Sequence, residues 1–531
     1  IIKRGEAYPS DIIEEMKNKK AFILVLFLTA FCSLFFMFCN DPDADDEFTE
    51  DNPASRAQLG KNLAEKHCQS CHLLPDPSLL DKQNWQLALE LMGPRLGIYA
   101  HNGRRYRIYT DIDQDNYPDK PSMNSWDWQN IIEYYAAMSP ETLPAQEKPK
   151  DISRHMPFFS VALPPGLFVS AGNLASLVKI DTTVKPARIW INRTSSTNTL
   201  LLLDGKMNII DSLNGSGPIV NLEPDANEWM ACKIGTDLLG NNARNGALMR
   251  LKVVNQKIQA APKPLFDSLA RPIHVAYADL NGDQQKDYLV AEFGNMFGSL
   301  IWMENQGRGK YIRRTIRSLP GASKTIVRDD NRDGQPNIWA LFGQGEEGIF
   351  LYANQGNGVF TEKQVIRFPA TYGSTSFELN DFNQDGFPDI LYTCGDRGDG
   401  IPQLKPYHGV YIYLNNGKNE FSKAYFFPIN GCVKAMAKDF DGDGDLDIAA
   451  IGFFTDNQQP SEGFTYLENK GSLDFQPYAL PLETGFKRAL TMDVGDINGD
   501  GKPDIVLGQG FMGNKSSGDK LPLCIALINQ F

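Results

Sequence analysis

The sequence has few of the features that mark a nucleic-acid-binding protein or a hydrolase. Lys and Arg number 52 against 65 Asp and Glu, so the net charge is −13, whereas binding to phosphates requires clustered Lys and Arg. Histidine is scarce, and His155, His274 and His408 show no spacing typical of metal ligands. No hydrolytic triad, phosphate loop or nicotinamide fingerprint stands out. We expect no nucleic-acid partner and assign no catalytic residues.

Long apolar runs are absent except for one near the N-terminus. From Met16 the chain reads MKNKK and then has an uncharged, mostly apolar run, Ala21–Phe38, which is the pattern of an export signal. Cys39 follows, and the sequence after it, NDPDADDE, resembles the lipidated cysteine and acidic tract of Bacteroidetes-type surface lipoproteins. We interpret residues 1–39 as an upstream extension plus a signal, lipoprotein or anchor segment.

Three forms of this segment remain open: a lipid on Cys39, an uncleaved membrane anchor, or a cleaved signal. Each exports the remaining chain, so we expect an extracytoplasmic protein, in the periplasm or at the cell surface. The first two forms attach it to a membrane, which is the expected state. Residues 40–54 are acidic and poor in apolar residues, and they predict a solvated tether.

A haem-attachment motif follows the tether. Leu59 and Leu63 lie four apart on a predicted helix capped by Ser55, and this helix leads to Cys68, Cys71 and His72. The spacing Cys-x-x-Cys-His supplies two thiols for the porphyrin vinyl groups and an imidazole for the iron. A thioredoxin-like pair would need a preceding βαβ pattern, and a zinc site would need a second ligand pair.

The resemblance of this segment to class I cytochromes c implies a second axial ligand. In that family a Met on the loop before the C-terminal helix binds the iron, which favours Met123 over Met92, Met138 and His101. Residues 55–145 match the size and helix order of the family, so we predict a small all-α cytochrome c domain with covalent haem c. Residues 146–156 read as a linker.

The remaining residues, 157–531, form a predicted β-propeller. Five acidic loops start 50 to 58 residues apart. Each leads into an apolar strand, and most then reach a second strand that ends in Asn-x-Gly, which is enough for one four-stranded blade. The loops are DLNGDQQKD from Asp279, DDNRDGQPN from Asp329, DFNQDGFPD from Asp381, DFDGDGDLD from Asp439 and DINGDGKPD from Asp496.

Oxygens at positions 1, 3, 5 and 9 of these loops, with a carbonyl at position 7, can surround a Ca²⁺ ion. An EF-hand is excluded because position 12 lies within a strand. The side chains expected to bind calcium are Asp279, Asn281, Asp283, Asp287, Asp329, Asn331, Asp333, Asp381, Asn383, Asp385, Asp389, Asp439, Asp441, Asp443, Asp447, Asp496, Asn498, Asp500 and Asp504. The metal-free alternative, plain Asp-Gly turns, is strongest where Gln284 replaces glycine and where Asn337 replaces the last Asp.

This layout resembles FG-GAP or VCBS repeats, which occur in integrin-like propellers and bacterial surface proteins. Residues 165–270 lack the acidic loops but have enough strand-like runs for two more blades, so we expect about seven. The last repeat stops at Phe531, before an outer strand, and residues 158–164 resemble the outer strand 475–481. We therefore predict that residues 158–164 complete the final blade.

Two classes of function follow. The first is an exported c-type cytochrome that passes electrons to a redox partner protein, with the propeller as a docking or ligand-binding module. The second is a haem-linked oxidoreductase with a substrate site on the propeller, for which Arg328, Lys434 and Arg488 are candidates, although the sequence alone reads them as ordinary surface charges. A surface adhesin that binds glycans or proteins is a further alternative. Cys232, Cys394, Cys432 and Cys524 read as buried thiols, although a Cys394–Cys432 bond stays open.

Overall fold

The computed structural model describes most of the chain after residue 52. Its described residues are 53–106, 117–149, 152–169, 173–238, 242–397, 403–456, 460–510 and 521–531. The predicted export segment, Cys39 and most of the tether lie outside them. Among the described residues, no helix combines the length and the apolar character needed to cross a bilayer.

The first described segment is built from helices. Its helices are α2 (Pro53–Cys68), α3 (Lys82–Met92) and α4 (Ser125–Met138), with short 3-10 turns at Pro77–Leu79 and Pro94–Leu96 and a small hairpin of β1 (Ala100–His101) and β2 (Arg104–Arg105). The predicted cap at Ser55 is wrong, because α2 begins at Pro53 and proline suits the first turn of a helix. Helix α3 is capped by Asp81 and α4 by Asn124, each side chain accepting a backbone N–H.

An aromatic core joins these helices. Trp85 of α3 and Tyr135 of α4 lie with ring centroids 4.2 Å apart, and the fully buried Trp128 donates from Nε1 to the Tyr106 hydroxyl at 2.9 Å. The Trp85 and Tyr135 polar atoms donate to the carbonyls of Pro77 and Pro75. Each large ring is therefore buried with its polar atom hydrogen-bonded, which avoids the cost of an unpaired donor.

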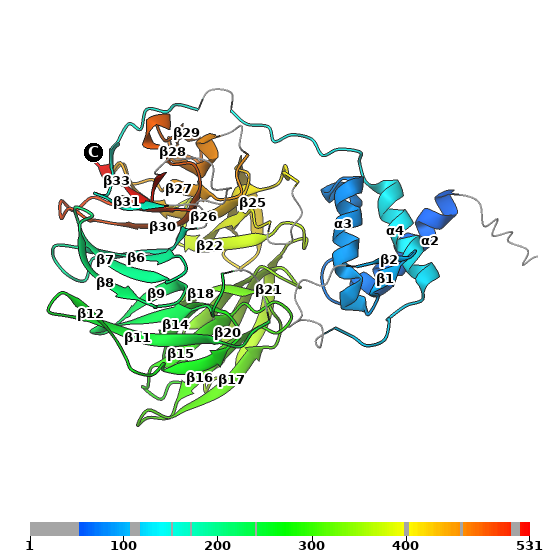
Figure 1. The fold of residues 1–531 in the computed structure, drawn as a ribbon, viewed down its shortest axis with the longest axis horizontal. Helices are drawn as coiled ribbons and strands as arrows, with labels where there is room; N and C mark the ends of the chain where they lie inside the picture. Colours follow the sequence, from blue (N-terminus) through cyan, green and yellow to red (C-terminus); the bar gives the residue numbers. More distant parts are fainter. Residues whose placement is uncertain are drawn as a thin grey trace, which may run out of the picture. The chain divides into compact units, whose positions relative to one another are not determined.

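The described strands from residue 159 onward form a seven-blade propeller, which confirms the prediction (Figure 1). Blades 1 and 2 are β5 (Leu174–Asp181), β6 (Arg188–Thr194), β7 (Thr199–Asp204), β8 (Ile209–Asn214) and β9 (Ile219–Asp225), β10 (Glu228–Lys233), β11 (Gly246–Val254), β12 (Lys257–Ala260), β13 (Phe266–Leu269). Blades 3 and 4 are β14 (Pro272–Ala278), β15 (Asp287–Glu292), β16 (Ser299–Asn305), β17 (Tyr311–Arg317) and β18 (Ala322–Arg328), β19 (Asn337–Phe342), β20 (Gly348–Asn354), β21 (Phe360–Arg367).

The next three blades repeat this meander. Blades 5 and 6 are β22 (Ser374–Asn380), β23 (Asp389–Cys394), β24 (Gly409–Asn415), β25 (Phe421–Pro428) and β26 (Cys432–Lys438), β27 (Asp447–Gly452), β28 (Phe464–Asn469), β29 (Phe475–Ala479). Blade 7 is β30 (Ala489–Gly495), β31 (Asp504–Gln509), β33 (Cys524–Asn529) and β3 (Phe159–Ala162), and β4 (Phe168–Val169) pairs with β32 (Leu521–Pro522). The second strands β15, β23, β27 and β31 are buried throughout and pack between neighbouring blades. Their burial explains why an apolar sequence follows each of these acidic loops.

The N-terminal strand closes the ring, as predicted. Strand β3 pairs antiparallel with β33, from Phe159 opposite Asn529 to Ala162 opposite Ala526. Phe159 and Met156 are buried in the core shared by blades 6 and 7. Both ends of the propeller sequence therefore belong to one blade, which leaves no unpaired edge between the first and last repeats.

The described cysteines are all free thiols. Cys394 and Cys432 lie on neighbouring blades but form no disulfide, and both are fully buried, as are Cys232 and Cys524. The four propeller cysteines are therefore buried thiols in this structure, as interpreted from the sequence, and the alternative Cys394–Cys432 disulfide is not formed. Burial raises the pKa of each of these four thiols, so they stay protonated and unreactive.

Candidate functional site: five acidic loops and a Cys-x-x-Cys-His segment

The five acidic loops all connect the first strand of a blade to its second strand. The loop from Asp279 joins β14 to β15, and the others occupy the same place in blades 4 to 7. Blades 1 and 2 have other connections there. Five equivalent loops therefore lie at one end of the propeller, each held by two strands that are part of the core.

The loop from Asp496 illustrates the hydrogen-bond pattern of the acidic loops. The Asp496 carboxylate accepts the backbone N–H groups of Gly499 at 2.6 Å and Gly501 at 2.9 Å. The side-chain oxygens of Asn498 and Asp500 accept N–H groups two residues further on, both at 2.9 Å. The backbone thus folds around the side chains at positions 1, 3 and 5 and holds their oxygens close together.

Two positions in each loop adopt the left-handed backbone conformation. Position 4 has a φ between 57° and 86° in all five loops, and position 6 is glycine with positive φ in four of them. In the first loop Gln284 occupies position 6 with a φ of 66°. The turn therefore forms without glycine there, at a conformational cost that an L-residue with a Cβ bears.

The carboxylates at position 9 are fully buried at the start of the second strand. Asp287, Asp389, Asp447 and Asp504 each accept one N–H group from position 2 of the loop and one from the Asn that ends the third strand of the blade. Burial raises the pKa of each, that of Asp447 to about 6. A carboxylate oxygen has a second lone pair, so these groups can bind an ion and keep these hydrogen bonds.

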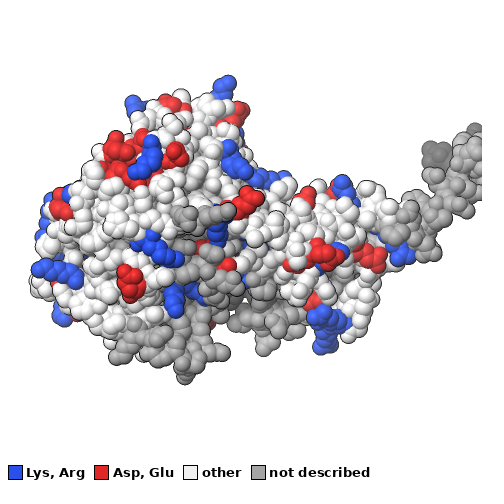
Figure 2. Space-filling view, turned by 90° about the horizontal axis from the view of Figure 1, so that it is seen from above, with Lys and Arg blue, Asp and Glu red and all other residues white. Residues whose placement is uncertain are grey.

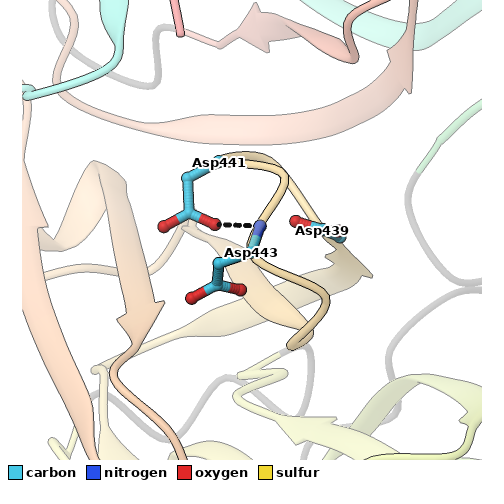
Figure 3. Close-up of side chains that lie close together, drawn as sticks. All are labelled: Asp439, Asp441 and Asp443. Atoms are coloured by element: carbon cyan, nitrogen blue, oxygen red, sulfur yellow. Dashed lines mark hydrogen bonds between the residues drawn. The ribbon is translucent and has the colours of Figure 1, made fainter.

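The loop from Asp439 has the strongest acidic cluster. Asp439, Asp441 and Asp443 each bring a carboxylate oxygen within 4.8 Å of the others, and the Asp441 carboxylate accepts the Asp443 N–H (Figure 3). In the other four loops position 3 is Asn, whose amide donates to the Asp at position 5. Asp441 cannot donate in this way, and its pKa is raised by burial and by its acidic neighbours. Carboxylates about 4 Å apart repel by roughly 4 kcal/mol at an effective dielectric of 20, which a cation would remove.

Two acidic residues outside the loops contribute to these sites and were missed from the sequence. Glu468 of β28 is 2% exposed and close enough to Asp441 to raise its pKa. Glu304 of β16, at the equivalent place in blade 3, accepts from the Asn281 amide at 3.2 Å. Both directly precede the Asn of the Asn-x-Gly turn, and this recurrence of Glu before Asn is the signal that could have identified them.

The Cys-x-x-Cys-His motif lies at the C-terminal end of α2. Cys68 is the last residue of the helix, and Cys71 is exposed. Burial, and then the nearby Cys71, raises the pKa of Cys68 to about 11. The Nδ1 atom of His72 lies 2.9 Å from the Leu73 carbonyl oxygen, which leaves Nε2 as the ring atom for a metal. Burial lowers the pKa of His72, so its imidazole is neutral at pH 7.

The candidate second ligands have different surroundings. Met123 is 7% exposed and belongs to the same apolar cluster as Cys68, on the loop before α4. His101 is engaged instead, with Nε2 2.6 Å from Gln129 Oε1. Met138 is 58% exposed, and Met92, the last residue of α3, packs against the same cluster but is only partly buried. Two free thiols, an oriented imidazole and a buried thioether fit a covalently attached haem, and among the candidates Met123 fits best.

Two of the residues suggested for a substrate site on the propeller, Arg328 and Lys434, occupy different environments. Arg328 ends β18 and pairs with Asp330 at 2.7 Å, so it has a local structural partner. Lys434 lies in the middle of β26, the first strand of blade 6, and its Nζ donates to the Met492 carbonyl of blade 7 at 2.7 Å. Lys434 is therefore not the ordinary surface charge that its sequence suggests.

On the face shown in Figure 2, basic and acidic side chains are interspersed.

Comparison with known proteins supports the repeat assignment. Residues 329–392 and 439–507 match the FG-GAP-like repeat family. These two ranges hold the second, third, fourth and fifth acidic loops completely, and they extend into the strands that follow these loops. The repeat resemblance drawn from the acidic loops is therefore confirmed for this part of the chain.

Two curated relatives are integrin chains. Human integrin alpha-6 is 27% identical over 176 residues, which is 30% of this chain and 15% of the relative. Integrin alpha-PS3 of Drosophila melanogaster is 26% identical over 211 residues, or 39% of this chain and 16% of the relative. The chain thus spans about a sixth of the length of these relatives.

Solved structures with a similar arrangement share little sequence. BBS1N, in a crystal structure with ARL6DN, has a TM-score of 0.43 and 9% identity, covering 70% of this chain and 97% of that chain. The N-terminal domain of Nup159 has a TM-score of 0.39 and 10% identity, covering 72% and 99%. On the evidence of its own strands and of the matched repeats, the chain contains FG-GAP-like repeats on a seven-blade β-propeller.

Proposed function

We propose that the protein is an exported c-type cytochrome that transfers electrons through haem bound to the helical segment, with a calcium-stabilised propeller that binds a partner. The observation that carries the redox part is the Cys68, Cys71 and His72 motif at the end of α2, together with Met123 in the same apolar cluster.

Several residues of the helical segment would support a bound haem. The Leu73 carbonyl oxygen lies beside His72 Nδ1 and would fix the orientation of the imidazole. The buried rings of Trp128, Tyr106 and Tyr135 would exclude water from the apolar side of the site. When bound, haem supplies a one-electron Fe(II)/Fe(III) couple, and a Met opposite the His raises its potential.

The propeller would serve as the binding module of the same protein. Calcium at the acidic loops would neutralise carboxylates that otherwise repel, and this fixes the loops without changing the blades. Calcium binding of this kind suits an extracytoplasmic protein, where free Ca²⁺ reaches the range of extracellular modules. Attachment to a membrane, through a lipid on Cys39 or an N-terminal anchor, is part of the proposal, as is a redox partner protein.

The test is a pyridine haemochrome spectrum of the full chain produced with cytochrome c maturation machinery. We expect a c-type α-band that is lost in a Cys68→Ala, Cys71→Ala variant and kept in the Cys232→Ala control, since Cys232 lies in the propeller core. Met123→Ala should abolish the charge-transfer band of methionine-ligated ferric haem, whereas Met92→Ala should retain it. Folded protein without covalent haem would refute the redox function.

A second candidate is a surface adhesin without electron transfer. The integrin-like repeats favour it, because they match 39% of the chain while the helical segment lies outside the family match. Calcium-dependent binding of a glycan or protein by folded, haem-free protein would support this candidate. If haem is present and binding requires it, the cytochrome proposal gains support instead.

A further inference from the structure

Each blade contributes one ionisable side chain from the middle of its first strand to the centre of the propeller. The first strands of neighbouring blades contact one another and form the innermost ring of strands. In blade order the side chains are Lys179, Glu223, His274, Lys324, Glu378, Lys434 and Asp493. Three ammonium groups thus face three carboxylates and one imidazole.

Several contacts show that these groups face one space from different blades. Lys179 Nζ lies 3.7 Å from the Glu223 carboxylate, and Lys324 Nζ lies 3.9 Å from that of Glu378, both across blade boundaries. His274 is neutral at pH 7, because burial and then the charges of Lys324, Lys179 and Lys434 lower its pKa to about 3. The Lys324 side chain is 22% exposed, so solvent reaches this space.

The strand register separates these groups into two levels in blades 3 to 7. His274, Lys324 and Lys434 lie opposite the fifth residue of the second strand, as do Ser376 and Thr491. Glu378 and Asp493 lie opposite the third residue. Two residues along a strand correspond to roughly 7 Å. The level further from the acidic loops therefore has two ammonium groups, an imidazole and two hydroxyls, and its carboxylates lie one level away.

The carboxylates are already engaged with the protein. Glu378 accepts the Ala437 N–H at 3.0 Å, and Asp493 accepts the Ile180 N–H at 2.8 Å. Lys434 uses one of its three donors on the Met492 carbonyl. The nearest carboxylate to Lys324, at 3.9 Å, is beyond hydrogen-bond distance. Ammonium donors thus remain at the level of His274, Lys324 and Lys434 in the central channel, which is the space enclosed by the first strands of the blades.

We propose that the central channel binds a small tetrahedral oxyanion, such as sulfate or phosphate, at the level of His274, Lys324 and Lys434. Donors that converge from several blades match the oxygens of such an anion, which point in different directions. The ammonium groups supply charge, and the hydroxyls of Ser376 and Thr491 supply neutral hydrogen bonds. The site is built from residues of the innermost strands and is separate from the acidic loops.

The test is isothermal titration of the full, calcium-loaded chain with sodium sulfate at constant ionic strength and pH 7. We expect saturable binding of one sulfate, weakened at least tenfold in Lys434→Met and in Lys324→Met. Lys423→Met on the outer strand β25, where the lysine is exposed, is the matched control and should bind as wild type does.

The proposal is overturned if wild type shows no saturable sulfate binding, or if all three variants bind sulfate with wild-type affinity. Thermal unfolding in chloride shows whether each variant is folded before titration. If Lys434→Met does not fold, Lys324→Met alone decides, because among the described residues the ammonium group of Lys324 has one ion-pair contact, the long one with Glu378.

Discussion

Blades 1 and 2 and blades 3 to 7 build the same four-strand meander with different first connections. In blade 2 the connection between β9 and β10 is the tight turn at Ala226, which has a φ of 55°. In blades 3 to 7 it is an acidic loop whose first Asp accepts the backbone N–H of position 6. A short turn is stabilised by its own backbone, whereas an acidic loop holds like charges that a bound cation would neutralise. The two regions should therefore respond differently to calcium.

The largest loss of stability should come from a deletion that affects the blades with acidic loops and the blades without them alike. Deleting residues 152–165 removes β3 and the buried Phe159 and Met156. Losing two such side chains costs roughly 5 kcal/mol or more, which is comparable with the stability of a domain. We expect circular dichroism to show loss of the propeller with or without calcium.

A point variant sharpens this prediction. Phe159→Ser should destabilise the propeller strongly, whereas Ser160→Asp, at the exposed neighbouring position of β3, should have little effect. Wild-type melting of the deletion variant would show that β3 is dispensable for closure.

Calcium removal should separate the two regions. At a calcium concentration tenfold above the dissociation constant, each site adds about 1.4 kcal/mol, so five sites add about 7 kcal/mol. We expect EDTA to lower the melting temperature and to open the acidic loops to proteolysis before the turn at Ala226. Cleavage mapped by mass spectrometry checks this order, and Mg²⁺ in place of Ca²⁺ is the control. Equal cleavage of both regions would contradict the comparison.

The sequence predicted the repeated features well. Apolar second strands and acidic loops recur at similar spacing, so the seven blades and the closing strand could be inferred from local patterns. Glu468 was missed because it lies on β28, far along the chain from the loop that it approaches. Lys434 was treated as a surface charge because the centre of the propeller combines one residue from each repeat, and these residues differ in type from blade to blade.

Metal-free protein should show an unusual pH response in the blades with acidic loops. The pKa of Asp447 is about 6 in the folded state, because of burial, and about 3.9 when unfolded. A raised folded pKa adds stability that is complete below about pH 4 and is lost as pH rises through about 6, by roughly 3 kcal/mol. No equivalent carboxyl begins β6, where the residue is Arg188.

Urea unfolding in EDTA between pH 4 and pH 7.5 tests this response. The pH dependence should be smaller in Asp447→Asn than in wild type, while calcium should reverse the wild-type trend because protons compete for the ligands. Identical pH dependence of the two proteins in EDTA would show that Asp447 does not titrate as described.

A smaller effect is expected from the loss of one site. Asp443→Asn removes one carboxylate from the cluster at Asp439, so it should lower stability by about 1.4 kcal/mol in calcium and raise stability in EDTA, where it relieves the repulsion between carboxylates. Asp267→Asn, an exposed position on β13 of blade 2, is the matched control and should be neutral in both conditions. Calorimetric counting of bound Ca²⁺ checks the variant, which should bind one ion fewer. An unchanged count would exclude calcium from this loop.

The smallest effect concerns the loop that departs from the glycine pattern. Gln284 has a φ of 66° where the other four loops have glycine, and this conformation costs an L-residue roughly 1–2 kcal/mol. Glycine relieves the strain but makes the unfolded chain more flexible, so Gln284→Gly should stabilise the protein by about 0.5–1 kcal/mol. Gln285→Gly, at the next position, gains no such relief and should destabilise it. Chemical denaturation of both variants in EDTA separates this backbone effect from calcium binding, and destabilisation by Gln284→Gly would show that the glutamine side chain stabilises this loop in another way.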